Sequence, residues 1–127
     1  MELPALVSVI ALLEYMFFAF KVGLGRDKFD VQAPAVSGHP EWERLFRVQQ
    51  NTVEQLVVFL PALFLFATYA SEAVAAALGL VFILGRALYA RGYVLDPAKR
   101  GPGFLLTVIA NFCLLLGGLI GAVLASR

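Results

Sequence analysis

Hydrophobic residues form four long runs along the chain, and short polar segments separate them. The runs cover about 3–22, 53–69, 73–94 and 103–125, and a more polar stretch beginning near Glu41 precedes the second. A helix needs about 20 predominantly apolar residues to cross the roughly 30 Å hydrocarbon layer, whereas a crossing strand needs about ten with alternating polarity. The pattern therefore predicts four membrane-spanning α-helices, over about 3–22, 41–69, 73–94 and 103–125, in a single domain covering residues 1–127.

Composition agrees with an all-α, integral membrane four-helix bundle. The 127 residues are 61% hydrophobic and only 15% charged, whereas soluble domains are about 45–50% apolar and roughly 25% charged. The formal net charge of +1 argues against nucleic acid as a partner, because phosphate binding needs a clustered basic surface. One cysteine, Cys113, and one histidine, His39, exclude an intrachain disulfide and the common Cys and His metal motifs, so no metal is expected.

The basic residues are distributed unevenly over the three predicted loops. The first loop spans about 23–43, the second about 70–72 and the third about 96–103. The cations flanking the first loop are Lys21, Arg26, Lys28, Arg44 and Arg47, those flanking the third are Arg91, Lys99 and Arg100, and the second has none. The positive-inside rule then predicts a multi-pass protein of the inner or plasma membrane, with the first and third loops cytoplasmic and both termini outside.

The second predicted helix carries a row of polar residues that a membrane span rarely contains. Arg44, Arg47, Asn51 and Glu54 follow one another at spacings of three, four and three, which places them on one helical face. One interpretation is that Arg44 and Arg47 are snorkelling anchors at the interface, or that Arg47 and Glu54 neutralise charged partners on adjacent helices. The amide and the carboxylate favour a binding face instead, since ionisable residues in a span usually face a wet cavity and anchoring requires neither group.

The third predicted helix carries a matching row, Arg86, Tyr89 and Tyr93. Tyrosines of an aromatic belt are the alternative for Tyr89 and Tyr93, but the arginine on the same face favours a site. Together the two rows suit a small polyanionic ligand that also carries an amine. Arginines would bind carboxylates, Glu54 an ammonium group, and Asn51 peptide amides.

Two segments resemble the MAPEG family, the membrane-associated proteins in eicosanoid and glutathione metabolism. The stretch from Pro40 to Glu54, PEWERLFRVQQNTVE, is similar to the family signature E-R-x-x-R-x-Q-x-N-x-x-E. The stretch from Gly85 to Tyr93, GRALYARGY, is similar to its helix 3 pattern. The likeness in hydropathy and loop placement covers essentially the whole chain, and we expect a prokaryotic member. The resemblance to the family implies a homotrimer of four-helix subunits, with glutathione bound between neighbouring subunits near the cytoplasmic face.

The resemblance also implies a role for individual residues. The residues that would hold glutathione from one subunit are Arg47, Asn51, Glu54, Arg86, Tyr89 and Tyr93, and those from the next subunit are Arg26 and Gln49. Arg100 matches the family arginine that stabilises the thiolate of glutathione, and a cation beside a thiol does lower its pKa. Glutathione is thus expected as a co-substrate. Gln55 stands where several family members have an aromatic residue, and Asp27 stands where leukotriene C4 synthase has a second arginine. These two departures favour a general transferase.

The expected function is that of a membrane-bound glutathione S-transferase, with peroxidase activity as an addition, acting on lipophilic electrophiles in the bilayer. A non-catalytic lipid-binding or scaffold member and a glutathione-dependent isomerase are the alternatives. Its expected partners are further copies of the chain, membrane lipids and lipophilic small molecules. Glu14, in the middle of the first span, is expected either to pair with Asn111 or to be protonated and bonded to backbone.

Overall fold

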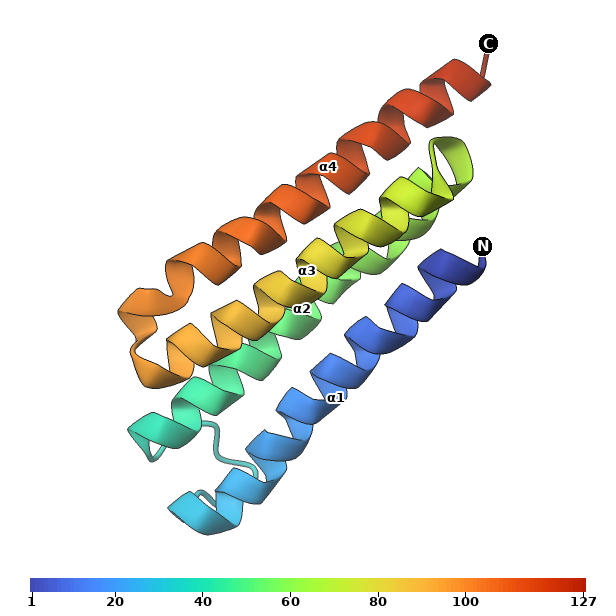
Figure 1. The fold of residues 1–127 in the computed structure, drawn as a ribbon. Helices are drawn as coiled ribbons and strands as arrows, with labels where there is room; N and C mark the ends of the chain where they lie inside the picture. Colours follow the sequence, from blue (N-terminus) through green and yellow to red (C-terminus); the bar gives the residue numbers. More distant parts are fainter.

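The computed structural model describes residues 1–127 as a bundle of four long helices (Figure 1). The elements are α1 (Glu2–Phe29), α2 (Pro40–Tyr69), α3 (Glu72–Leu95), a 3-10 turn η1 (Pro97–Arg100) and α4 (Gly101–Ala125). All four helices are long and apolar enough to cross a membrane, and the chain contains no strand. The all-α fold class is confirmed, and the chain is an integral, multi-pass membrane protein.

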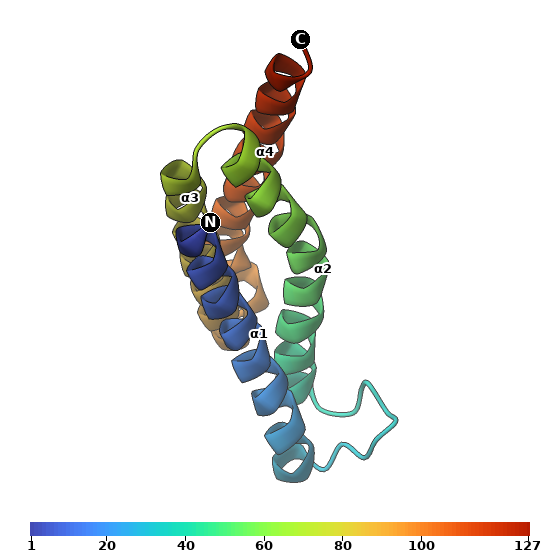
Figure 2. The ribbon, with the colours of Figure 1, turned by 90° about the vertical axis from the view of Figure 1, so that its right-hand side faces the viewer.

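The helices α2 and α3 form the centre of the bundle. Helix α1 packs on one side of this pair and α4 on the other, as Figures 1 and 2 show. The rings of Phe59 and Phe82 stack between α2 and α3 with their centroids 3.9 Å apart. The outer faces remain apolar, with Phe20 and Phe112 more than 60% exposed. Such an outward hydrophobic surface suits lipid, because hydrocarbon makes no demand for polar contacts.

The two ends of the bundle differ in what they carry. Both termini and the short α2–α3 link lie at one end (Figure 1). The α1–α2 loop and η1 lie at the other, which we call the loop end. The first and third loops therefore share one side of the membrane. That this side is the cytoplasm remains a prediction from the charge distribution.

Helix α1 continues past the expected end at position 22 to Phe29. Gly25 falls within the predicted loop range 23–43, but it lies where α1 meets the indole of Trp42, and a Cβ there would be 3.0 Å from Cδ1 of that ring. The indole Nε1 donates a hydrogen bond of 3.0 Å to the Val22 carbonyl. The glycine thus permits close packing, and the helix ends only at Asp30, whose φ of 55° is left-handed.

Helix α2 begins with an N-cap made by a side chain, and α4 begins with a close contact to the backbone of α3. His39 is the N-cap of α2, its Nδ1 accepting from the Glu41 N–H at 3.2 Å, and Pro40 occupies the first helical position. In α4, Gly103 lies directly against the backbone of Tyr89, so that a Cβ there would collide with it. This contact brings the start of α4 against the middle of the polar row on α3.

Candidate functional site

A polar pocket of about 510 Å³ opens near the loop end, between α2, α3 and the start of α4. Its lining residues are Arg47, Asn51, Tyr89, Tyr93, Arg100 and Phe104. The first two come from α2, the tyrosines from α3, and the last two from η1 and α4. The volume lies in the range of sites for small molecules, roughly 300–1,000 Å³. The structure therefore brings five of the expected site residues around one cavity.

Arg86 lies behind this pocket and is completely buried, with 0% exposure. Its Nη2 donates to Oδ1 of Asn51 at 2.7 Å and to Oγ1 of Thr52 at 3.1 Å, and its Nη1 donates to Oγ1 of Thr107 at 3.3 Å. The guanidinium also covers the ring of Tyr89, 4.3 Å from the centroid. Arg86 therefore supports two residues of the pocket lining without lining it itself.

The two threonines are oriented to accept from Arg86. Thr52 donates its own hydroxyl to the Val48 carbonyl at 2.7 Å, and Thr107 donates to the Gly103 carbonyl at 3.0 Å. Each hydroxyl proton is thereby committed to its own helix, which leaves the oxygen lone pairs directed at the guanidinium. Three helices thus hold one cation in a fixed position.

No carboxylate neutralises Arg86 by direct contact. The only salt bridges in the structure join the Met1 amino group to Glu2 and Glu72, at the far end of the bundle. The Nε atom of Arg86 is buried and has no hydrogen-bond partner. Buried charges are normally paired, because desolvation is costly. The one carboxyl group that acts on Arg86 electrostatically is that of Glu14 on α1, which forms no salt bridge with it. Arg86, Arg47 and Arg100 together make this cavity attractive to anions.

The aromatic side chains form one wall of the pocket. The ring centroids of Tyr89 and Tyr93 are 5.6 Å apart, and those of Tyr89 and Phe104 are 6.4 Å apart. Arg100 lies exposed at the mouth, where its Nη1 donates to the Pro97 carbonyl at 2.7 Å. That bond ties the side chain to its own turn, and exchanging it for a ligand needs only a change of side-chain rotamer.

The remaining three expected residues lie elsewhere in the single chain. Glu54 is exposed on α2 and does not line the pocket. Gln49 faces α1, where its Nε2 donates to the Tyr15 hydroxyl at 3.3 Å. Arg26 donates to the Ala35 carbonyl at 2.9 Å and covers the indole of Trp42, 4.6 Å from the ring centroid. A contribution of Arg26 and Gln49 to a neighbouring copy remains a prediction.

Sequence reasoning missed three residues around the pocket, Thr52, Phe104 and Thr107. Only their closeness in the sequence to predicted site residues could have indicated them, since Thr52 follows Asn51 directly and Phe104 lies four residues after Arg100. The expected pairing of Glu14 with Asn111 is wrong, since Asn111 donates its Nδ2 to Oε1 of Gln55 at 3.1 Å. Helices α1 and α4 lie on opposite sides of the bundle. Glu14 forms no backbone hydrogen bond either, and its Oε1 is buried without a partner.

Comparison with known proteins gives consistent matches over nearly the whole chain. The model of the MAPEG family matches residues 4–120. Microsomal glutathione S-transferase 2 of Homo sapiens is 43% identical over 118 residues, which cover 92% of this chain and 80% of the relative. Leukotriene C4 synthase of Rattus norvegicus is 34% identical over 132 residues, which cover 98% of this chain and 88% of the relative. An uncharacterized protein of the cyanobacterium Synechocystis is 44% identical over 117 residues, covering 92% and 85%.

Proposed function

Because the chain belongs to the MAPEG family, we propose that it is a membrane-bound glutathione S-transferase acting on lipophilic electrophiles. The observation that carries the proposal is the cluster of three arginines at the polar pocket, Arg47 and Arg100 in its lining and Arg86 behind it without a salt bridge. Glutathione carries two carboxylates, one ammonium group and one thiol. Its net negative charge would be attracted to these arginines.

The assignment of ligand groups to residues follows the chemistry of the pocket. Arg47 is exposed at the cavity and can form a two-pronged bond with a carboxylate. Asn51 has its Oδ1 held by Arg86, which leaves its amide N–H groups free to donate to a peptide carbonyl. The tyrosine rings cover the apolar parts of the ligand. In the proposed homotrimer, Arg26 and Gln49 of a neighbouring copy and Glu54 complete the contacts.

The proposed reaction begins with loss of the thiol proton to solvent at the loop end. Arg100 stabilises the resulting thiolate, because a guanidinium near sulfur favours the anion. The sulfur lone pair then forms a bond to an electrophilic carbon of a lipophilic molecule in the bilayer. A leaving group departs with its electron pair, or an activated double bond takes up a proton. No metal takes part in this scheme.

A stopped-flow experiment on the purified protein tests the proposal directly. Mixing with glutathione should produce the ultraviolet absorbance of a thiolate at neutral pH, whereas S-methylglutathione should bind without that signal. A model electrophile added afterwards should consume the absorbance as the thioether forms. Binding without thiolate formation would instead assign the chain to the non-catalytic, lipid-binding or scaffold members. Absence of binding would refute the proposed function altogether.

Replacing Arg47 with alanine is expected to weaken glutathione binding roughly tenfold to a hundredfold. The variant loses a charge-assisted hydrogen bond, and such bonds contribute about 1.5–3 kcal/mol. Equilibrium dialysis with labelled glutathione measures the effect. Arg44→Ala is the matched control, because Arg44 lies one turn earlier but donates to the Val94 carbonyl at 3.2 Å, outside the pocket. Equal affinity of Arg47→Ala and wild type would return Arg47 to the role of an interface anchor.

Co-expression of two inactive variants is expected to restore activity if the site is shared between copies. Arg26→Ala and Arg47→Ala should each lack most transferase activity alone. In a mixed oligomer, some sites combine an intact Arg47 from one copy with an intact Arg26 from its neighbour. Recovery of activity, together with trimers in native mass spectrometry, supports the shared site. If each chain formed its own complete site, the mixture would stay as inactive as its components.

A further inference from the structure

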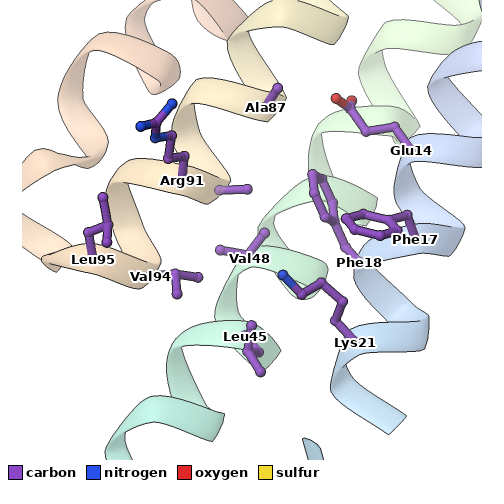
Figure 3. A pocket seen from close by; sticks show the side chains of 11 residues that line it. Glu14, Phe17, Phe18, Lys21, Leu45, Val48, Ala87, Arg91, Val94 and Leu95 are labelled. Atoms are coloured by element: carbon purple, nitrogen blue, oxygen red, sulfur yellow. The ribbon is translucent and has the colours of Figure 1, made fainter. Parts of the chain in front are cut away.

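A second cavity of about 520 Å³ lies between α1 and α3, with α2 as its floor. Eight of its 11 lining residues are hydrophobic. Figure 3 shows Phe17 and Phe18 of α1 on one side, Ala87 and Arg91 of α3 on the other, and Val48 of α2 between them. The cavity shares no lining residue with the polar pocket. It is therefore a separate site, open toward the apolar surface of the bundle.

Two cations line this cavity from opposite helices, Lys21 from α1 and Arg91 from α3. Both side chains are exposed, and neither forms a salt bridge. The amine of Lys21 points into the space between the helices, whereas the guanidinium of Arg91 is turned away from Lys21 (Figure 3). A change of the Arg91 side-chain rotamer would bring its guanidinium to a phosphate held by Lys21. Both residues lie in the part of their helices nearer the loop end, where lipid headgroups meet the protein. Basic pockets between transmembrane helices bind anionic lipid headgroups.

Glu14 defines the opposite end of the cavity. It lies seven residues before Lys21 on α1, which corresponds to about two helical turns or roughly 10 Å. Its carboxyl group is directed away from the two phenylalanine rings (Figure 3). An acidic group bound in the cavity would find no cation at this end, whereas Lys21 and Arg91 line the other. The charges therefore orient a bound lipid with its acid at the loop end and its chain toward the membrane centre.

Arg26 and Gln49, the two residues expected to reach a neighbouring copy, do not line this cavity. A contact between copies through these two residues therefore does not by itself occupy the cavity.

We propose that this cavity binds an anionic phospholipid, with one acyl chain against Phe17 and Phe18 and the phosphate between Lys21 and Arg91. The lipid chain fills the space between α1 and α3, and the phosphate links the two helices through their cations. Binding therefore stabilises the position of α1 in the bundle. This inference is independent of the proposed glutathione chemistry.

Lipid retention by the full-length, delipidated protein tests the inference. The protein is incubated with phosphatidylglycerol or with phosphatidylcholine of identical chains, and native mass spectrometry counts the lipids that remain bound. Two cations near the surface should give a roughly tenfold to thirtyfold preference for phosphatidylglycerol. The anionic lipid should also raise the thermal unfolding midpoint, because a ligand of the folded state stabilises it. Equal retention of the two lipids by the wild type would overturn the proposal.

Three variants separate the cavity from general surface electrostatics. Lys21→Gln/Arg91→Gln should lose the preference, whereas Lys28→Gln should keep it, because Lys28 lies on the same helix but outside the cavity. Ala87→Phe, at an exposed lining position, should reduce lipid retention with all charges intact.

If Lys28→Gln reduced the preference for phosphatidylglycerol as much as the double variant did, the cavity would not be a specific lipid site. Wild-type lipid retention by Ala87→Phe would contradict the proposal in the same way. Loss of oligomers in Ala87→Phe would assign the cavity to a subunit contact. Displacement of phosphatidylglycerol by equimolar oleate, but not by oleyl alcohol, would identify a fatty acid as the occupant instead.

Discussion

Arg86→Met is expected to abolish most glutathione affinity while leaving the ligand-free protein at least as stable as the wild type. The buried guanidinium has three hydrogen-bond acceptors but forms no salt bridge. Replacing a buried charge by a well-packed apolar side chain is often neutral or stabilising. Thr52 and Thr107 keep the bonds to their own helices. The ligand-free variant should therefore lose little or no stability.

Glutathione binding should respond in the opposite direction. Arg86 does not line the pocket but holds Asn51, which does. A hydrogen bond to a charged group contributes about 1.5–3 kcal/mol, so the variant should lose about tenfold to a hundredfold in affinity. Loss of the bond to Asn51 also frees that side chain to leave the pocket. Thermal unfolding with and without glutathione measures both effects in one experiment.

Arg86→Lys serves as the comparison, because it keeps the charge but not the planar fork. It should bind glutathione with intermediate affinity, since a single ammonium group cannot reach Asn51, Thr52 and Thr107 together. A methionine variant that is strongly destabilised but still binds glutathione normally would show that Arg86 is purely structural. Wild-type affinity in the lysine variant alone would mean that charge, and not geometry, determines binding.

The sequence was most informative where helical periodicity fixes which residues share a face. Arg47 and Asn51 are four residues apart, as are Tyr89 and Tyr93, and both pairs do line the pocket. Periodicity orients a side chain about its helix axis, but it does not tell how close the neighbouring helix lies. Arg86 shares a face with Tyr89, yet it lies behind the pocket because Thr52 and Thr107 of two other helices enclose it.

Other features depend on contacts between helices, which a single sequence does not reveal. Gly25 falls within the predicted first loop, although in the structure it belongs to α1 and its small size lets Trp42 pack against that helix. Glu14 and Asn111 lie in the middle of their spans, but α1 and α4 are on opposite sides of the bundle. The signature from Pro40 to Glu54 nevertheless indicated the family, and the match over residues 4–120 confirms it.

Arg100→Ala is expected to retain most glutathione affinity but to lose about twenty- to thirtyfold in turnover at pH 7. A free thiol with a pKa near 8.5 is only a few per cent ionised at that pH. Lowering the pKa by about two units makes the thiolate the majority species, and each unit corresponds to about 1.36 kcal/mol. Arg100 is exposed at the pocket mouth and held only by the Pro97 carbonyl. The substitution therefore removes the positive charge near the sulfur and has little effect on the packing of the bundle.

The pH dependence provides the decisive measurement. In the wild type, the thiolate forms at a lowered pKa, so turnover should reach its plateau below pH 8. In Arg100→Ala, turnover should rise with pH until it passes the ordinary thiol pKa near 8.5, and the deficit should shrink accordingly. Lys99→Ala is the matched control, because Lys99 is an exposed neighbour on the same turn and does not line the pocket. Wild-type turnover of Arg100→Ala at pH 7 would reject this mechanism, and Tyr93 would become the next donor to test.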